Sequence, residues 1–276
     1  MLLVAGIVTY NPDIERLGEN LSAASSQVDR VVIVDNGSKN YPAITGLCDK
    51  FPTEVIHNEE NRGIATALNQ IASKATECGA NWLLTLDQDS VCGEGLVAEY
   101  ESHVGESDVA SMTCRITDRS FAYKEPDKKY VDSCITSGNY IDLAEWKRLG
   151  GFDERLFIDR VDTDYCYRLR LDGKKILSIA SVGILHEVGT GTSEHSFLGK
   201  HFVVFNHSAF RVYYITRNQV YFARKHRLSL GEARYHRYVR TAWTRIFVYL
   251  FYEDDKFAKL CQWSRGLRDG YLMGIG

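Results

Sequence analysis

Apolar runs and amphipathic segments alternate over the first 87 residues of the chain. Runs typical of buried strands occupy residues 2–10, 31–35, 54–57 and 82–87, and segments with apolar residues at helical spacing occupy 14–24, 44–48 and 63–77. We expect Asn11 to cap the first helix, with Pro12 at its first position. Strands that alternate with helices at this spacing predict an α/β fold, with a parallel sheet and helices on both of its faces.

The pattern changes after residue 89. Strands are predicted at 109–113, 130–134 and 175–180, helices at 144–149 and 163–171, a loop that we interpret as a lid at 189–193, and a helical, aromatic and basic segment from Phe202 onward. No proline-rich linker or internal repeat separates these parts. We therefore expect one α/β domain over residues 1–199, followed by a helical extension over residues 200–276.

Charge is distributed unevenly along the chain, although the formal net charge of 276 residues is only -3. Residues 1–150 contain 13 Lys and Arg against 23 Asp and Glu, a net -10, whereas residues 200–268 contain 14 against 4, a net +10. With 45% hydrophobic residues and four prolines, the composition excludes a disordered, collagen-like or coiled-coil chain. The asymmetry predicts an anionic partner for the basic part.

The cysteines and the apolar segments bear on the compartment. Seven cysteines are scattered without a Cys-x-x-Cys pair, which indicates a reducing compartment such as the cytoplasm rather than a disulfide framework or a zinc site. The apolar start of the chain lacks a basic segment before it and is interrupted at Asn11-Pro12, so we interpret it as a strand and not as a signal peptide. No apolar run is long enough to span a bilayer.

Two carboxylates, Asp87 and Asp89, directly follow the apolar strand at 82–87. Ligands bind beyond the carboxyl ends of strands in open parallel sheets, which is where this pair is expected. Carboxylates so close together repel each other unless a cation joins them, and hard divalent cations share such oxygens with substrate phosphates. The pattern predicts a metal site, with a solvated turn as the alternative.

Polar side chains also end the first two strands. Thr9 and Tyr10 follow the first strand, and Asp35 ends the second, so that the same edge of the sheet is expected to carry them all. A nucleotide pocket requires such convergence. For Asp35, a turn-forming role with the following Asn-Gly is an equally good interpretation.

Further along the chain, other candidates have competing structural roles. Asp162 lies at the expected start of the helix at 163–171 and fits either a general base or a helix cap, whereas dipole electrostatics alone account for Asp164. His186 is a candidate ligand only if it faces Asp87 and Asp89. Arg62-Gly63, at a predicted helix start, fits either phosphate binding or ordinary helix initiation.

Taken together and in order, these segments resemble the family 2 glycosyltransferases. The matching segments are IVTYNP (7–12), VVIVDNGS (31–38), NRGIATALN (61–69), LTLDQDS (84–90), SGNYI (137–141), GGFDERLFIDRVDTDYCYRLR (150–170) and LHEVGTG (185–191). DQDS, VDTDYCYRLR and YYITRN (213–218) are most similar to the bacterial rhamnosyltransferase branch, which uses dTDP-L-rhamnose. The resemblance implies the GT-A fold, a Rossmann-like mixed sheet that binds a nucleotide-diphospho-sugar.

The resemblance also implies roles for single residues. Contacts with the nucleotide-sugar are implied for Thr9, Tyr10 and Asp35 at the nucleoside, Asn61, Arg62 and Gly63 beside the nucleotide, Asp87 near the ribose and the metal, and Ser137 and Gly138 near the sugar. Asp89 and His186 would bind Mg²⁺ or Mn²⁺, and Asp162 would be the base. Val161 stands where the family usually has a glutamate.

These roles imply an inverting reaction, in which Asp162 deprotonates an acceptor hydroxyl as it attacks the anomeric carbon. The acceptor would be a glycan or a lipid-diphosphate-linked sugar in the synthesis of a bacterial surface polysaccharide. Two alternatives stay open: a phosphatase of the haloacid-dehalogenase type that uses Asp87 and Asp89, and a non-catalytic module that binds sugar nucleotides.

The basic segment at 200–268 interleaves arginines with aromatic residues. It contains no nucleic-acid recognition motif, and we expect no nucleic-acid partner. Peripheral contact with an anionic membrane at the inner face of the plasma membrane accounts for the pattern. Packing of the aromatic residues on the protein's own core or on the second subunit of a homodimer accounts for it as well.

Overall fold

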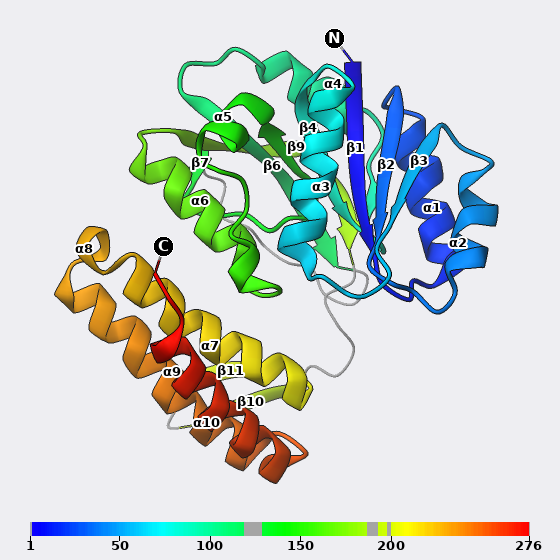
Figure 1. Cartoon of the computed structure of the whole chain (residues 1–276). Coiled ribbons are helices and arrows are strands. Elements are labelled where there is room, and N and C mark those ends of the chain that lie inside the picture. The colour runs from blue at the N-terminus through cyan, green and yellow to red at the C-terminus, as the bar shows by residue number, and fades with distance from the viewer. Residues whose placement is uncertain (1, 119–128, 187–192, 198–199, 276) are drawn as a thin grey trace. The chain divides into compact units, whose positions relative to one another are not determined.

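The computed structural model describes residues 2–118, 129–186, 193–197 and 200–275. The predicted lid loop at 189–193 lies outside these residues except for Ser193. The chain forms two compact units (Figure 1). The first unit contains residues 1–157 and 161–188, and the second contains residues 158–160 and 189–276.

A mixed β-sheet forms the centre of the first unit. Its elements are β1 (Leu2–Thr9), α1 (Ile14–Ser25), β2 (Arg30–Asp35), α2 (Tyr41–Cys48), β3 (Thr53–His57), α3 (Ile64–Glu77), β4 (Ala80–Asp87), β5 (Val91–Cys92), α4 (Leu96–His103), β6 (Val109–Asp118), β7 (Tyr130–Val131), β8 (Asn139–Asp142), α5 (Leu143–Arg148), a short 3-10 helix (Glu154–Leu156), α6 (Val161–Leu171) and β9 (Lys175–His186). The strand order is β3-β2-β1-β4-β8-β6-β9-β5, with β7 paired to β9. The predicted α/β fold with helices on both faces is confirmed.

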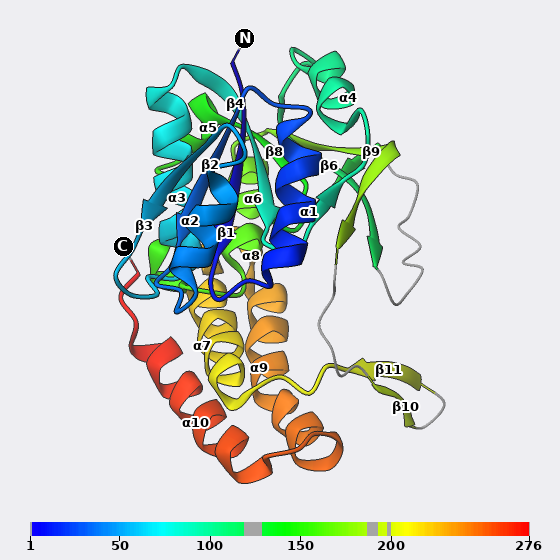
Figure 2. The ribbon, with the colours of Figure 1, turned by 90° about the vertical axis from the view of Figure 1, so that its right-hand side faces the viewer.

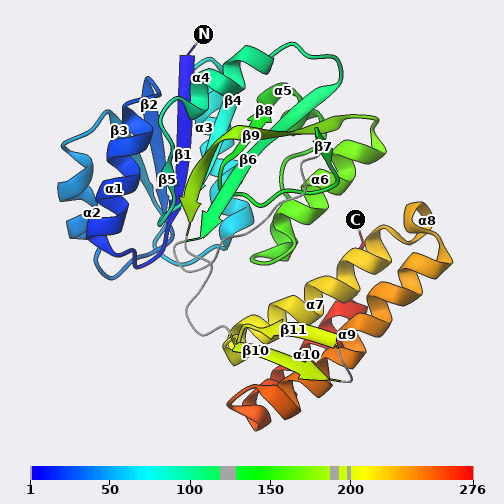
Figure 3. The same ribbon diagram turned by 180° about the vertical axis from the view of Figure 1, so that it is seen from behind.

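The sheet is parallel where the site residues lie. Strands β1 to β4 run parallel, whereas β8 is antiparallel to both β4 and β6. Helix α1 lies in front of the sheet in Figure 3 and α3 lies behind it, and the order is reversed in Figure 1. The buried runs of β1, β2 and β4 are apolar on both sides because helices cover both faces.

Four expectations about element bounds were wrong. Asp13, not Asn11, caps α1, since its side chain accepts a hydrogen bond from the backbone N–H of Arg16, while Asn11 has a left-handed φ of 48°. The strand expected at 175–180 extends to His186, and the strand expected at 130–134 ends at Val131. The helix expected at 163–171 begins at Val161, so Asp162 lies inside its first turn.

The second unit is a helical bundle with one hairpin (Figure 2). The hairpin consists of β10 (Ser193–Phe197) and β11 (Lys200–Val204), and the helices are α7 (Ala209–Lys225), α8 (Arg227–Leu230), α9 (Glu232–Tyr252) and α10 (Lys256–Leu272). The expectation of a helix from Phe202 was therefore wrong, because the helices begin at Ala209. No helix in the described residues is long and apolar enough to cross a membrane.

Two glycines set the distance between α10 and α7. A Cβ at Gly266 would lie 2.7 Å from the carbonyl oxygen of Tyr213, and one at Gly270 would lie 2.7 Å from that of Arg217. These distances are too short for any other residue, so the two helices pack backbone to backbone along this line.

At the turn between α9 and α10, the buried ammonium group of Lys259 lies 2.7 Å from Glu253 Oε2 and 2.7 Å from Asn206 Oδ1.

Candidate functional site

The carboxyl end of β2 carries a fully buried carboxylate, that of Asp35. Its Oδ1 accepts a hydrogen bond from the hydroxyl of Thr9 at 3.0 Å, and its Oδ2 accepts one from the backbone N–H of Ser38 at 3.0 Å. His57 Nδ1 lies 2.9 Å from the same Oδ2, and the His57 ring stacks on Tyr41 at 3.9 Å between centroids. Asp35 is thus held in one orientation, and the role of Thr9 is to hold the Asp35 carboxylate.

His57 was not among the residues singled out from the sequence. It ends β3, and the parallel register pairs it with Asp35, which in turn pairs with Thr9 on β1. The signal that could have identified it is its place at the end of a strand whose neighbours also end in polar residues. Tyr10, which directly follows β1, is 49% exposed, and its backbone N–H donates to Gln88 Oε1 at 2.9 Å.

Asp87, Asp89 and His186 come together at the end of β4, as the sequence required for a metal site. His186 Nδ1 lies 3.4 Å from Asp89 Oδ1, and His186 Nε2 lies 4.0 Å from Asp87 Oδ2. Asp89 Oδ1 is buried and accepts no hydrogen bond. Leaving a buried acceptor without a partner costs about 1–3 kcal/mol, and more for a charged group, so this oxygen is suited to a cation.

The donor set is incomplete without further ligands. No group of three His, Cys, Asp or Glu side chains in the described part of the chain is arranged to hold an ion by itself. Mg²⁺ commonly binds through one or two carboxylates, with substrate phosphates and water as its other ligands. Two carboxylates and one imidazole therefore fit an ion that binds together with a phosphorylated substrate.

A chain of hydroxyl groups lies beneath Asp87 and His186. The backbone N–H of Asp87 donates to Ser137 Oγ at 3.2 Å, Ser137 donates to Ser90 Oγ at 2.5 Å, and Ser90 Oγ lies 2.9 Å from His186 Nδ1. When Nδ1 carries the ring proton, Ser90 accepts it and Nε2 keeps the lone pair that a metal requires. Ser137 is fully buried and supports the loop through these hydrogen bonds. Ser90 was not predicted from the sequence as a residue of the site.

Gly138, the residue after Ser137, is held against the sheet. Its φ is 74°, and its backbone N–H donates to the carbonyl oxygen of Thr85 at 2.9 Å. The hydroxyl of Tyr100 donates to the Gly138 carbonyl oxygen at 2.5 Å. A Cβ at Gly138 would lie 2.8 Å from Cys114 Sγ, so only glycine fits this position.

Asn61, Arg62 and Gly63 directly precede α3. Asn61 Oδ1 accepts a hydrogen bond from the Gly63 N–H at 2.9 Å, and the first N–H of the helix, that of Ile64, donates to the carbonyl oxygen of Phe157 at 2.7 Å. Gly63 has a φ of 85°, and a Cβ there would lie 2.6 Å from the Phe157 ring. The Arg62 side chain is exposed.

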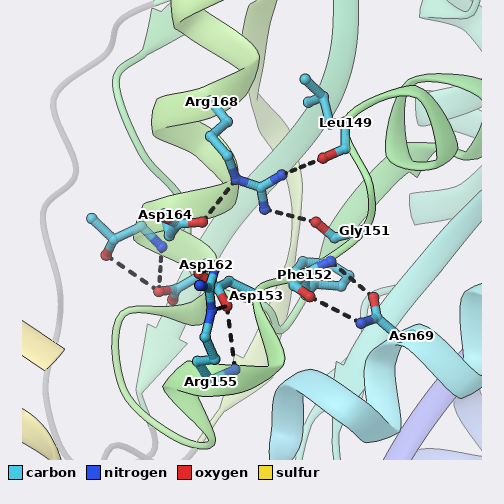
Figure 4. Close-up of polar contacts among 10 residues, drawn as sticks. Asn69, Leu149, Gly151, Phe152, Asp153, Arg155, Asp162, Asp164 and Arg168 are labelled. Carbon is cyan, nitrogen blue, oxygen red and sulfur yellow. Dashed lines mark hydrogen bonds and ion pairs between the residues drawn. The ribbon is translucent and has the colours of Figure 1, made fainter. Parts of the chain in front are cut away.

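Two aspartates in the first turn of α6 have different surroundings (Figure 4). Asp164 is fully buried, and its Oδ2 lies 2.8 Å from Arg168 Nε. The Arg168 guanidinium donates to the carbonyl oxygens of Leu149 and Gly151 at 2.8 and 2.7 Å. Asp164 therefore orients an arginine that holds the preceding turn, and dipole electrostatics alone do not describe it.

Asp162 is bonded to the residue that follows it in α6. The backbone N–H of Thr163 donates to its Oδ1 at 2.6 Å, and the Thr163 hydroxyl lies 3.3 Å from the same oxygen (Figure 4). The side chain is partly exposed. Because the helix already begins at Val161, Asp162 is not its cap. A partly exposed carboxylate fixed by its own helix start is suited to proton transfer.

The turn before α6 is anchored to α3 by Asn69 (Figure 4). Asn69 Nδ2 donates to the carbonyl oxygen of Phe152 at 2.9 Å, and Asn69 Oδ1 accepts from the Phe152 N–H at 2.8 Å and from Trp146 Nε1 at 3.1 Å. Gly151 has a φ of 76°, and a Cβ there would lie 2.7 Å from Asn69 Oδ1. Asn69 and Arg168 together fix the segment that leads toward the candidate base.

Replacing Asp164 by alanine is expected to destabilise the protein without a specific effect on the candidate base. The change leaves the largely buried Arg168 guanidinium without its carboxylate, which costs about 3–5 kcal/mol. Urea denaturation measures this loss. Glu54→Ala, which removes partly exposed ion pairs with Arg30 and Lys74, is the matched control and should cost less than about 1 kcal/mol. Equal losses in the free energy of unfolding of the two variants would contradict the role of Asp164 in holding Arg168.

A family model described as glycosyl transferase family 2 matches residues 5–171, which include most of β1, all of β2 to β4, and Asp87, Asp89 and Asp162. The chain belongs to glycosyl transferase family 2. It is therefore a glycosyltransferase, and the phosphatase alternative does not hold.

The family 2 chain is similar to named relatives over most of its length. It is 27% identical over 247 residues to the dTDP-rhamnosyl transferase RfbF of Shigella flexneri, a match that covers 83% of this chain and 82% of the relative.

Among solved structures, the family 2 chain is similar to the mannosyltransferase PcManGT of Pyrobaculum calidifontis in complex with GDP-Man and Mn²⁺, with a TM-score of 0.63, 15% identity, and coverage of 99% and 75% of the two chains. It is also similar to S. aureus TarS 1-349 in complex with UDP-GlcNAc, with a TM-score of 0.63, 15% identity, and coverage of 98% and 80%. These likenesses confirm the GT-A fold expected from the sequence.

Proposed function

We propose that this family 2 glycosyltransferase transfers L-rhamnose from dTDP-L-rhamnose to a hydroxyl group, with inversion at the anomeric carbon. The observation that carries the chemistry is the place of Asp162 inside the first turn of α6, where the Thr163 N–H holds its Oδ1 and the side chain is partly exposed. The similarity to a dTDP-rhamnosyl transferase over most of both chains supports the donor. The acceptor is a glycan or a lipid-diphosphate-linked sugar of a bacterial surface polysaccharide.

The donor binds along the edge formed by β1, β2 and β4. Asp35, fixed by Thr9 and His57, lies at the pyrimidine end of this edge, and the exposed ring of Tyr10 lies beside the nucleoside. Asn61, Arg62 and Gly63 flank the nucleotide, and Arg62 supplies a cation to the phosphates. Ser137 and Gly138 lie near the transferred sugar.

Asp89 and His186 hold a divalent cation, Mg²⁺ or Mn²⁺, with Asp87 beside it. The buried Asp89 Oδ1 without a hydrogen bond, and His186 Nε2 at 4.0 Å from Asp87 Oδ2, support this assignment. One similar solved structure, that of PcManGT, is a complex with GDP-Man and Mn²⁺. When bound, the cation offsets the charge that develops on the diphosphate leaving group.

Asp162 accepts the proton of the acceptor hydroxyl while the oxygen attacks the anomeric carbon from the side opposite the diphosphate. The Thr163 N–H bond to Oδ1 stabilises the carboxylate and fixes its direction. Asp162 is the positioned base, and no carboxylate of the described residues is assigned the role of nucleophile, so single displacement accounts for the arrangement and the configuration inverts.

A thermal-shift panel tests the donor. The protein is heated with dTDP-L-rhamnose, UDP-GlcNAc or a GDP-sugar, each with Mn²⁺ and with EDTA. We expect a rise in melting temperature with dTDP-L-rhamnose and Mn²⁺ that exceeds the rise with any other pair, since a ligand at 100 times its Kd stabilises by about 2.7 kcal/mol. A larger rise in melting temperature with another nucleotide-sugar would assign that sugar, in place of rhamnose, as the donor. No rise with any of the nucleotide-sugars would contradict nucleotide-sugar binding.

One face of α9 supports peripheral membrane contact. Phe247 and Phe251 are 59% and 70% exposed, and Trp243, Arg240 and Arg237 continue the same face at helical spacing. Exposed aromatic rings next to arginines match the boundary of an anionic membrane, where each cation contributes about 1 kcal/mol. This contact would place the enzyme on the inner face of the plasma membrane, next to a lipid-linked acceptor.

Liposome co-sedimentation tests this face. Binding is expected to phosphatidylglycerol vesicles and not to phosphatidylcholine vesicles, with a loss of about fivefold for Arg240→Glu. Lys50→Glu, an exposed charge reversal in the first unit, is the control and should leave binding unchanged. Equal binding of both variants, with a dimer in light scattering, would assign the aromatic face to a homodimer instead.

A further inference from the structure

The Asp35 carboxylate is closed off from solvent by the residues that hold it. Its side chain has no exposed surface. Its oxygens accept hydrogen bonds from the Thr9 hydroxyl and the Ser38 backbone N–H at 3.0 Å each, and His57 Nδ1 lies 2.9 Å from Oδ2. A ligand can form a hydrogen bond only with an atom that it can reach. In this arrangement Asp35 orients its neighbours, and a contact with the base of the donor has to come from one of them.

The imidazole of His57 is the neighbour that reaches solvent. Thr9 is fully buried, as Asp35 is, whereas 34% of the His57 side chain is exposed. His57 ends β3, and the parallel register places it beside Asp35, which is beside Thr9. The imidazole thus lies at the carboxyl edge of the parallel strands, where ligands bind in open sheets.

The carboxylate decides which nitrogen of the His57 ring carries the proton. An ionised carboxylate can only accept hydrogen bonds, so His57 Nδ1 donates to Asp35 Oδ2. In the neutral ring, Nε2 then has a lone pair and no hydrogen. Within the described residues, Nε2 has no hydrogen-bond partner in the chain. The ring therefore presents a free acceptor at this edge of the sheet.

A stacked aromatic ring fixes the plane of the imidazole. Tyr41, the first residue of α2, has its ring centroid 3.9 Å from that of His57, at an interplanar angle of 29°. The bond from Nδ1 to Asp35 fixes the rotation of the ring within that plane. An acceptor that is already oriented loses little freedom when a ligand binds, and this favours selective recognition.

We propose that His57 recognises the base of the donor: Nε2 accepts the hydrogen bond from the N3–H of thymine or uracil, while Asp35 orients the ring and keeps the proton on Nδ1. The inference rests on the proposed function, because it concerns the nucleotide of the same donor. Thymine and uracil carry a hydrogen on N3, whereas cytosine has a lone pair there. The site therefore prefers dTDP-sugars and UDP-sugars over CDP-sugars.

Titration calorimetry of the full chain with nucleoside diphosphates and Mn²⁺ tests the inference without sugar transfer. The unmodified protein is expected to bind dTDP about 10–100-fold more tightly than dTDP methylated at N3, and more tightly than dCDP. The analogue and dCDP both lack the N3–H and leave the acceptor without a partner.

Two substitutions at His57 separate contact with the base from support of Asp35. Asn in His57→Asn can donate to Asp35 in place of Nδ1 but has no atom at the position of Nε2. The Kd for dTDP should rise about 3–10-fold, and the preference over the N3-methyl analogue should fall below about twofold. His57→Gln extends its amide oxygen toward the position of Nε2 and should bind dTDP at least about twofold more tightly than His57→Asn.

The control is His103→Asn, the same exchange at a histidine of α4 that pairs with Glu106. It should leave both the Kd for dTDP and the preference over the N3-methyl analogue unchanged. In steady-state kinetics, His57→Asn should raise the donor KM about 3–10-fold and keep kcat within about twofold, because the contact is the same in the ground state and the transition state.

The outcomes distinguish this inference from the proposed function. Equal binding of dTDP and its N3-methyl analogue by the unmodified protein overturns the inference alone. A preference that His57→Asn retains in full assigns the recognition of N3 to another residue and also overturns it. Tighter binding of dCDP than of dTDP, or no binding of any of the nucleotides, overturns both.

Discussion

Asp162→Asn is expected to abolish sugar transfer while the donor still binds. A positioned general base contributes about 10²–10⁴-fold to the rate, and an amide cannot accept the proton. The amide oxygen can still accept the Thr163 N–H, so the start of α6 should stay intact. We expect kcat to fall by that factor and the donor Kd, measured by titration calorimetry, to stay within about twofold.

Asp164→Asn is the matched control, because it changes the same functional group two residues away. Its carboxylate is paired with Arg168, so the expected effect is a lower free energy of unfolding, with kcat of the folded fraction largely retained. The two variants should thus separate: one loses the rate and keeps the stability, and the other does the reverse. Full turnover by Asp162→Asn would refute the assignment of the base.

Asp89→Asn is expected to have the second large effect, a loss of metal-dependent activity by about 10²–10³-fold. The substitution removes the charge from the buried oxygen that lacks a hydrogen bond, and electrostatic stabilisation of a leaving group is typically of this size. The donor Kd should also rise in Mn²⁺ and become insensitive to EDTA. Activity against Mn²⁺ concentration, together with donor titration, measures both effects.

The control is Asp132→Asn, which changes an exposed carboxylate that forms an ion pair with Arg170. Its activity and its response to Mn²⁺ should equal those of the unmodified enzyme. EDTA should reduce the unmodified enzyme to the level of Asp89→Asn. An Asp89→Asn variant with the full Mn²⁺ response would show that the cation, if used, lies elsewhere.

The strands and their ends could be predicted because burial leaves a local pattern. The runs in β1, β2 and β4 are apolar on both faces, and this fixes them as central parallel strands. In such a sheet the strand ends meet at one edge, so the sequence was sufficient to bring Asp35 and Asp87 to that edge.

The supporting hydrogen bonds could not be predicted, because they join residues far apart in the chain. His57 on Asp35, and Ser90 and Ser137 beneath His186, are ordinary polar residues until the register of the sheet is known. The strand predicted at 175–180 continues to His186 because it pairs with β6 as far as Asp118 and with β5.

The different surroundings of the two aspartates of α6 could not be predicted from the sequence either. In the sequence both lie near a helix start and both fit dipole electrostatics. Only the structure shows that Asp164 is buried against Arg168, whereas Asp162 is partly exposed. Likewise, no local pattern assigns residues 158–160 to the second unit, because Asn218 and Gln219 hold them from about sixty positions away.

The most direct test of the central claim is the release of dTDP from dTDP-L-rhamnose in the presence of a lipid-linked glycan extract and Mn²⁺. We expect release by the unmodified enzyme, and at most about one hundredth of that rate both in EDTA and with Asp162→Asn. Release of UDP from a UDP-sugar while dTDP-L-rhamnose stays intact would contradict the donor. Equal release of dTDP by Asp162→Asn would contradict the mechanism.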